Sequence, residues 1–231
     1  LGICAFAFLS YPGFKVVSAS IDVSNSVAQM AKLDDPESPM TDADKQAIRE
    51  QYAEARPAFR EKVLAHKRNR RLELGTNAAL YFEDRMTMQY QVQEMLRIER
   101  IFEAEGINEE LEAYNPLIPD GSNWKATFMV EFAEAEERRA MLAQLVDIQN
   151  RVYVQVADFD RVFAIADEDL ERADEEKTSA VHFLRFELGP EMVKALKNGA
   201  SLAAGIDHEN YQVEIAPVAD NIRRSLLGDL D

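Results

Sequence analysis

A polar segment between Glu83 and Arg100 contains the residue types that acid–base catalysis and anion binding require. Tyr90, Glu94 and Arg97 are spaced i, i+4 and i+7, so a helix would place them on one face. Such a face could hold a small anion or transfer a proton, or it could be a solvated surface of ion pairs. The candidate catalytic residues here are Glu94 and Tyr90, and the candidate ligand-binding residues are Arg85, Gln91, Gln93, Arg97 and Arg100.

A second group of candidates lies in the segment that begins at His182. Its alternating pattern predicts a strand with His182, Leu184 and Phe186 on one face and Arg185 on the other. His182 is then either a hydrogen-bonded core imidazole or a third catalytic residue. In the second case, Glu94 and its neighbours would join His182 or Arg185 in one site, and Arg185 would bind the ligand.

Asp207 and His208 are the weakest candidates for a metal site. A carboxylate and an imidazole are metal-ligand types, and a histidine can also exchange protons near neutral pH. Neighbouring residues of a strand, however, point to opposite faces. We therefore predict no metal site and keep these two residues only as minor candidates.

The sequence lacks the local motifs of common cofactor sites. Its single cysteine, Cys4, excludes an intramolecular disulfide, a cysteine-ligated iron–sulfur cluster and a cysteine-rich zinc site. No Glu-x-x-His pair of the di-iron bundle type occurs, and no glycine-rich phosphate motif or nucleophile elbow is found. The prediction is a chain with no cofactor.

Charge excludes further classes of partner. The 42 acidic and 26 basic residues give a formal net charge of −16, which repels nucleic acids and anionic membrane surfaces. No apolar run reaches the roughly 20 residues that span a bilayer. One basic run, Lys67 to Arg71, could be a small anion-binding patch, but the favoured interpretation is the end of a helix, where cations complement the helix dipole. With the near absence of cysteine, these features favour a cytoplasmic protein.

Hydrophobic spacing predicts the elements that position these residues. A helix is expected from Thr41, broken or restarted at Pro57, and the strongest helix from Thr87 to Glu105, stopped by Gly106. Further helices are expected at 109–114, at 133–148 and after Pro190. Strands are expected on both sides of a turn at 75–77 and at 125–132, 152–156, 161–166, 181–188, 202–206 and 211–215. The prediction is an α+β fold, with N-terminal helices packed on a mixed, largely antiparallel sheet in a single domain.

Composition divides the chain into four parts. Residues 1–29 look foreign to the rest, either as a clipped secretory signal or as translated upstream sequence before a start at Met30. The second interpretation is favoured because a charged n-region is missing and Pro12-Gly13 interrupts the apolar stretch. Residues 30–40 form a polar lead-in, 41–216 the α+β domain and 217–231 a weakly patterned tail.

Four blocks of sequence resemble a bacterial family known as domain of unknown function 3501. The resemblance covers Arg56 to His208 and does not extend past Tyr211. The resemblance implies a characteristic gene neighbourhood, because the genes of such proteins often lie beside genes for rubrerythrin-like di-iron proteins and an iron–sulfur oxidoreductase. The blocks are 87–100, 113–121, 164–169 and 177–186.

Two functional hypotheses follow. The first is a cytoplasmic, non-redox accessory or assembly partner of a rubrerythrin and iron–sulfur oxidoreductase system, acting in electron transfer or oxidative-stress defence. The second is an enzyme or small-anion-binding protein with a Glu/Arg/Tyr/His site and no redox cofactor. Whether the protein is an enzyme, and its oligomeric state, stay open at this level.

Overall fold

The computed structural model describes residues 42–101, 103–166, 168 and 178–231. The predictions for residues 1–29 and 30–40 lie outside this part of the chain. Contacts divide the protein into two compact units. The helical unit contains residues up to Leu64 and Arg85–Pro116, and the sheet unit contains Ala65–Asp84 and Leu117–Asp231. Within the described ranges, no helix is long and apolar enough to cross a membrane.

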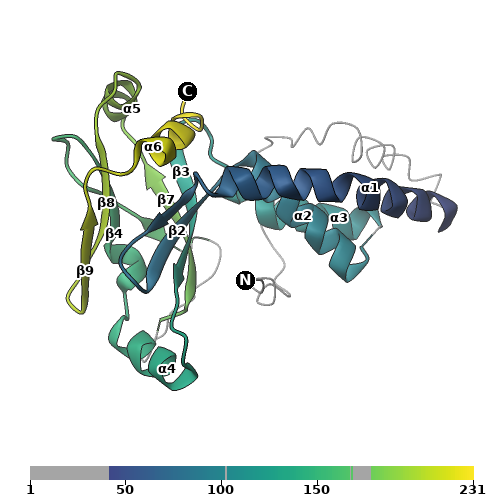
Figure 1. Cartoon of the computed structure of the whole chain (residues 1–231), viewed down its shortest axis with the longest axis horizontal. Coiled ribbons are helices and arrows are strands. Elements are labelled where there is room, and N and C mark those ends of the chain that lie inside the picture. The colour runs from purple at the N-terminus through teal and green to yellow at the C-terminus, as the bar shows by residue number, and fades with distance from the viewer. Residues whose placement is uncertain (1–41, 102, 167, 169–177) are drawn as a thin grey trace. The chain divides into compact units, whose positions relative to one another are not determined.

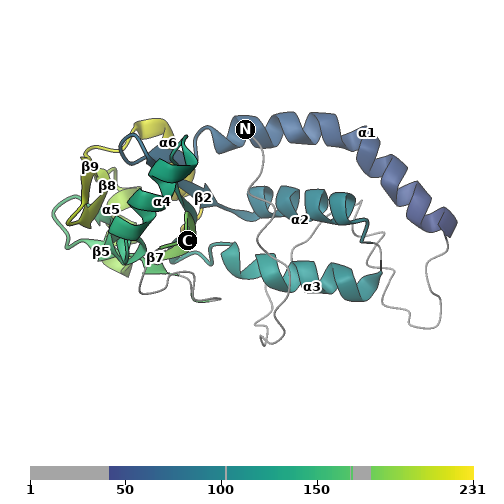
Figure 2. The same ribbon diagram turned by 90° about the horizontal axis from the view of Figure 1, so that it is seen from below.

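The helical unit consists of α1 (Asp42–Lys67, whose last three residues belong to the sheet unit), α2 (Arg85–Glu99), α3 (Ala104–Tyr114) and most of a short 3-10 turn, η2 (Asn115–Leu117), whose last residue belongs to the sheet unit. The expected break at Pro57 is wrong, because α1 runs through this proline as one helix. Figure 2 shows that α1 bends along its length. A proline inside a helix removes one backbone hydrogen bond and favours such a bend.

The helix predicted from Thr87 to Glu105 is divided in two. Arg100 adopts a left-handed conformation with φ 58°, and the Ile101 amide donates to the Leu96 carbonyl at 3.0 Å. This hydrogen bond closes the end of α2 as a C-terminal cap does. Gly106, expected to be the stop, lies inside α3 instead. The C-terminal end of α2 is therefore set by Arg100, a residue type that rarely takes this conformation.

The first sheet of the sheet unit has five antiparallel strands in the order β1-β2-β3-β7-β6. Gly75, at φ 81°, provides the expected turn before β2. A side chain at this position would also meet the Tyr211 hydroxyl at 2.6 Å, so glycine is required on two grounds. The strands are β1 (Arg71–Glu73), β2 (Ala78–Glu83), β3 (Asn123–Val130), β7 (Val181–Glu187) and β6 (Ile165–Ala166).

The second sheet has four antiparallel strands in the order β5-β4-β8-β9, namely β5 (Val162–Phe163), β4 (Val152–Val156), β8 (Leu202–His208) and β9 (Tyr211–Ile215). The single strand expected at 161–166 is wrong, because this segment passes from the edge of one sheet to the edge of the other. The two sheets form separate layers (Figure 1). Their facing side chains share one core, which includes Leu80, Phe82, Trp124, Phe128, Phe186, Val152, Val154, Val156, Leu202 and Ile206.

Helices close both ends of the two layers (Figure 1). At one end lies α4 (Ala135–Gln144), followed by a 3-10 turn, η3 (Ile148–Arg151). At the other end lie α5 (Pro190–Lys197), which starts at its proline as predicted, and α6 (Asp220–Leu227). The α+β fold class and the antiparallel pairing are confirmed.

The predicted tail is wrong, because the C-terminal segment is part of the core. Val218, Ile222, Leu226 and Leu230 are all buried in the same cluster as the sheets. Ile222 and Leu226, four residues apart, lie on one face of α6, so this helix packs as an amphipathic helix, and Val218 and Leu230 add to the core from the segments before and after it.

Candidate functional site

One row of charged side chains crosses the second face of the five-stranded sheet, opposite the core. Alternation in β3 turns Trp124 and Ala126 into the core and Lys125 to the other face. Strand register aligns Glu83 of β2 and Arg185 of β7 with Lys125. We call Glu83, Lys125 and Arg185 the polar row. Lys125 is therefore the direct cross-strand neighbour of both Glu83 and Arg185.

Arg185 is held by two carboxylates. Its Nε and Nη2 donate to the two Glu168 carboxylate oxygens at 2.8 and 2.7 Å, and its Nη1 forms an ion pair with Glu187. The hydrogen bonds from Arg185 lower the pKa of the Glu168 carboxyl. The predicted face of Arg185 is confirmed, opposite His182. The guanidinium already forms the paired hydrogen bonds by which arginine recognises a carboxylate.

Glu83 and Lys125 differ in how their charges are compensated. The Glu83 side chain is only 6% exposed, and the Thr127 hydroxyl donates to its Oε1 at 2.9 Å. Lys125 is half-buried and forms no ion pair with any residue that the structure describes. Burial, and secondly the neighbouring Arg185 charge, lower the pKa of Lys125. Sequence reasoning missed Lys125, although its place between Trp124 and Ala126 in an alternating strand was a usable signal.

A second group of charges surrounds Arg70, which is only 2% exposed. Its Nη2 pairs with Asp229 at 2.5 Å and its Nη1 with Asp84 at 3.4 Å. The Asp84 carboxylate also contacts the His66 Nε2 at 2.5 Å. We call these four residues the buried charge cluster.

The buried charge cluster is tied to the polar row through the backbone. Arg70 donates to the Phe82 and Glu83 carbonyls, each at 3.0 Å. Burial raises the pKa of Asp229, although the Arg70 charge and hydrogen bond oppose that rise. The cluster therefore joins the end of β2 to the segment after α6, with Arg70 paired to the carboxylates of both Asp84 and Asp229. The cluster thus stabilises the fold, and its most exposed group is the His66 imidazole.

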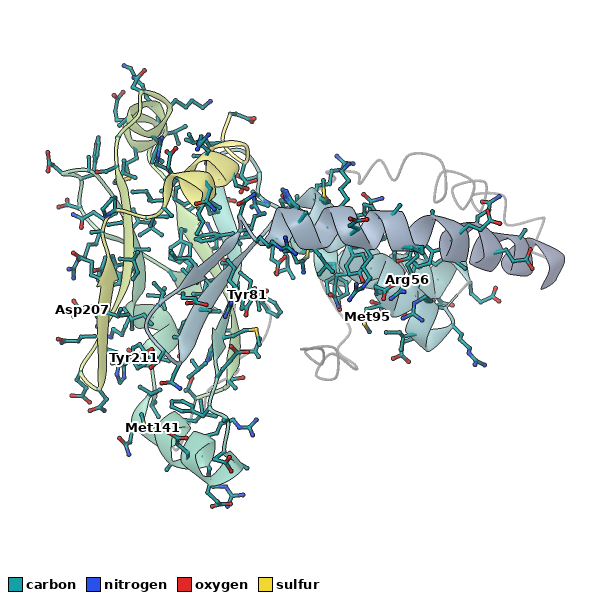
Figure 3. The ribbon with its side chains drawn as sticks, in the orientation of Figure 1. Arg56, Tyr81, Met95, Met141, Asp207 and Tyr211 are labelled. Atoms are coloured by element: carbon teal, nitrogen blue, oxygen red, sulfur yellow. The ribbon has the colours of Figure 1, made fainter. Side chains whose placement is uncertain are left out.

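Glu94 is clamped between α1 and α2. Arg56 of α1, labelled in Figure 3, donates to both Glu94 carboxylate oxygens at 2.7 Å. Arg97 adds two hydrogen bonds at 3.2 Å, and the Tyr52 hydroxyl donates one at 2.9 Å. The Arg56 hydrogen bonds are the main cause that lowers the pKa of Glu94 to about 2. The carboxylate is therefore ionised near neutral pH, which suits a structural anion better than a proton carrier.

Replacing Glu94 with glutamine is expected to destabilise the helical unit by about 1–3 kcal/mol at neutral pH, because charged hydrogen bonds are lost. The folded pKa of about 2 lies below the ordinary value of 4.5, so this stabilisation is full above pH 4.5 and is lost as the pH falls towards 2. Urea denaturation followed by circular dichroism at several pH values measures the difference. E112Q, at an exposed position on α3, is the matched control. An equal gap between wild type and E94Q at every pH would contradict the expectation.

The remaining candidates of the predicted helical face lie on α2 or directly after it. Tyr90 packs on Phe59 with ring centroids 6.0 Å apart, and Gln91 hydrogen-bonds with Tyr114. Gln93 is buried, and its Oε1 has no hydrogen-bond partner among the described residues. Arg85 is engaged in contacts within the protein. The backbone of Arg100 ends α2 in the left-handed conformation. The structure thus brings Glu94 and Arg97 together and adds Tyr52 and Arg56, which sequence reasoning missed.

His182 belongs to the core of the sheet unit. It is fully buried, with Nε2 at 2.8 Å from the Thr178 hydroxyl and 3.0 Å from the Ser179 carbonyl. This is the hydrogen-bonded core imidazole that the sequence allowed. Glu94 and His182 belong to different units, so a joint site of the two stays a prediction.

Asp207 and His208 point to opposite faces of β8, so they do not form one site. The His208 Nδ1 accepts from the Asn210 amide at 3.1 Å, and its Nε2 donates to the Val146 carbonyl at 2.9 Å. Asp207, labelled in Figure 3, accepts a hydrogen bond from Arg161 at 3.0 Å. Across the described ranges, no group of three or more His, Cys, Asp or Glu side chains is arranged to hold a metal ion.

Comparison with known proteins places this geometry in context. A family model described as "Protein of unknown function (DUF3501)" matches residues 43–230. This match extends beyond the Arg56–His208 resemblance and includes α6. A crystal structure of a novel protein of unknown function from Burkholderia pseudomallei K96243 is 49% identical, with a TM-score of 0.75, and the alignment covers 83% of this chain and 99% of that one. No curated protein matches this chain.

Proposed function

The chain belongs to the family described as "Protein of unknown function (DUF3501)", and we propose that it is a cytoplasmic accessory or assembly partner of a rubrerythrin-like and iron–sulfur oxidoreductase system. In this role it binds proteins that carry the redox centres and holds none itself. Its activity would support electron transfer or defence against oxidative stress. The proposal starts from the gene neighbourhood that the family resemblance implies.

The clamp around Glu94 is the observation that carries the proposal. A general acid or base needs a pKa near the working pH and a free position for the substrate. Glu94 has a pKa of about 2 and receives hydrogen bonds from three side chains. His182 and His208 also use their ring nitrogens in internal contacts. These polar residues stabilise the fold, and this favours a role in binding over a role in proton transfer.

Co-purification from a native host at low salt tests the accessory role. Tagged protein is expected to retain a rubrerythrin-like protein or an iron–sulfur oxidoreductase, identified by mass spectrometry. An unrelated tagged protein of similar net charge is the control, because a charge of −16 alone attracts basic proteins. Eluates from which both redox proteins are absent, also after chemical cross-linking, would count decisively against the proposal.

A second candidate function is an enzyme or small-anion-binding protein without a redox cofactor. Lys125, which is half-buried beside Arg185 and forms no ion pair with a residue that the structure describes, favours it, since a partly desolvated ammonium gains from an anionic ligand. Calorimetric titration with acetate and phosphate tests it. Binding that K125M abolishes would support this function, and identical heats for both proteins would reject it.

A further inference from the structure

We propose that Lys125 is the nucleophilic amine of a site for small 2-oxo acids, and that Arg185 binds the carboxylate of the same ligand. The amine would form an imine with the keto carbon. This inference does not depend on the accessory role above, because it concerns the polar row alone.

The position of the two cations matches the ligand. Lys125 on β3 and Arg185 on β7 are directly paired across the strands and lie on the same face. Such cross-strand neighbours have Cβ atoms about 4.5–5.5 Å apart. In a 2-oxo acid, the keto carbon is bonded directly to the carboxylate carbon. One ligand can therefore reach an amine and a neighbouring guanidinium together.

Lys125 also has the surroundings of a reactive amine. Only the neutral amine attacks a carbonyl, and burial or a nearby cation increases the neutral fraction. Both influences act here, because Lys125 is half-buried and Arg185 lies beside it, and together they outweigh the charges of Glu168, Asp120 and Glu187, which raise the pKa of Lys125. In the part of the chain that the structure describes, no carboxylate forms an ion pair with Lys125. The exposed lysines of α5, Lys194 and Lys197, lack this environment.

Glu83 supplies a carboxylate on the other side of Lys125. It is buried, paired in register with Lys125, and fixed by the Thr127 hydroxyl at 2.9 Å. In the proposed step, the Lys125 nitrogen adds to the keto carbon and the carbonyl oxygen becomes a hydroxyl group. That oxygen leaves as water with the two amine protons, which Glu83 is positioned to relay. The condensation releases one water and needs no oxidant or reductant.

Glu168 is the internal competitor for the ligand. Its carboxylate already occupies Arg185 in the paired geometry that a 2-oxo acid would adopt. Glu168 is exposed, so an external carboxylate can replace it. Removing the Glu168 charge is therefore expected to increase imine formation, because it releases Nε and Nη2 of Arg185, while Nη1 stays paired with Glu187, and removes an anion that favours the charged form of Lys125.

Reductive trapping tests the proposal. The full chain is incubated with pyruvate and sodium cyanoborohydride near neutral pH, and the modified lysine is located by peptide mass spectrometry. We expect Lys125 to be labelled faster than Lys194 or Lys197, because burial and the Arg185 charge lower the pKa of Lys125 and so increase its neutral fraction. E168Q should increase the yield at Lys125, and R185Q should reduce it.

Controls separate this chemistry from general lysine reactivity. K125R and K125M should lose the adduct, whereas K194M should keep it, and circular dichroism verifies that each variant is folded. Acetaldehyde, which lacks the carboxylate, should label Lys125 less than pyruvate does. Equal labelling of Lys125, Lys194 and Lys197 by pyruvate, or a preference for acetaldehyde, would overturn the proposal. Pyruvate binding without a trapped adduct would overturn it as well.

Discussion

Replacing Arg70 with methionine is expected to lower the free energy of unfolding by about 3–5 kcal/mol, because it leaves buried carboxylates without their counter-charge. Arg70 is almost fully buried and forms ion pairs with Asp229 and Asp84. It also donates to two backbone carbonyls of β2, at Phe82 and Glu83. Methionine fills a similar volume but supplies none of these hydrogen bonds. Urea denaturation followed by circular dichroism measures the loss.

Arg71 provides the matched control for Arg70, since it lies next in sequence and is exposed. It pairs with Glu73 and lies over the Tyr81 ring at 5.5 Å from the centroid. Exposed pairs of this kind contribute about 0–1 kcal/mol, so R71M should have a small effect. In R70M/D229N the loss should be smaller than the sum of the two single losses, because D229N removes the carboxylate charge that R70M alone would leave buried without a partner. Equal effects of R70M and R71M would contradict the role of Arg70.

Replacing Trp124 with alanine is expected to cost about 3–5 kcal/mol, which is the usual range for large cavities in a core. Trp124 is fully buried on β3, and its ring meets that of Phe82 edge-on at 6.2 Å. Its Nε1 donates to the Leu226 carbonyl of α6 at 2.9 Å, across 102 positions of sequence. The substitution therefore removes packing between the sheets and the link to α6 together.

W124F separates the two contributions of Trp124. Phenylalanine keeps an aromatic ring in the core but removes the Nε1 hydrogen bond to the Leu226 carbonyl. That carbonyl still accepts from the Asp229 amide at 3.2 Å, so the loss of this hydrogen bond should cost about 0.5–1.5 kcal/mol. Denaturation followed by circular dichroism suits both variants, because Trp124 is the single tryptophan and its fluorescence disappears in them. Limited proteolysis of the C-terminal segment shows whether α6 has detached. A stability of W124A within error of wild type would refute the assigned packing.

Short-range patterns in the sequence predicted much of the sheet unit. The turn at Gly75 was predictable because a backbone φ of 81° is easily adopted only by glycine. The start of α5 at Pro190 was predictable because proline suits the first position of a helix. Alternation placed His182 inside and Arg185 outside, because side chains of a strand point to opposite faces in turn. These features depend on residues within a few positions of each other.

Besides the alternation around Lys125, two further signals were present in the sequence but were not used. Arg70 precedes Leu72 and Leu74 by two and four positions, so alternation already placed it on their buried face. The basic run around it indicated a helix end instead, and α1 does end at Lys67. In the C-terminal segment, apolar residues recur at intervals of four from Val218 to Leu230, and the two in the middle, Ile222 and Leu226, form the buried face of α6.

The sequence by itself determined the α+β class, the faces of the strands and the family, because these follow from local periodicity and from long blocks of characteristic residues. Only the tertiary structure decided which charges are compensated. Arg70 meets Asp229 across 159 positions, and Arg56 meets Glu94 across 38. Lys125 lies between Glu83 and Arg185 only because three strands pair in one register. The energy of a charge depends on burial and on partners in space, and no spacing along the chain encodes either of them.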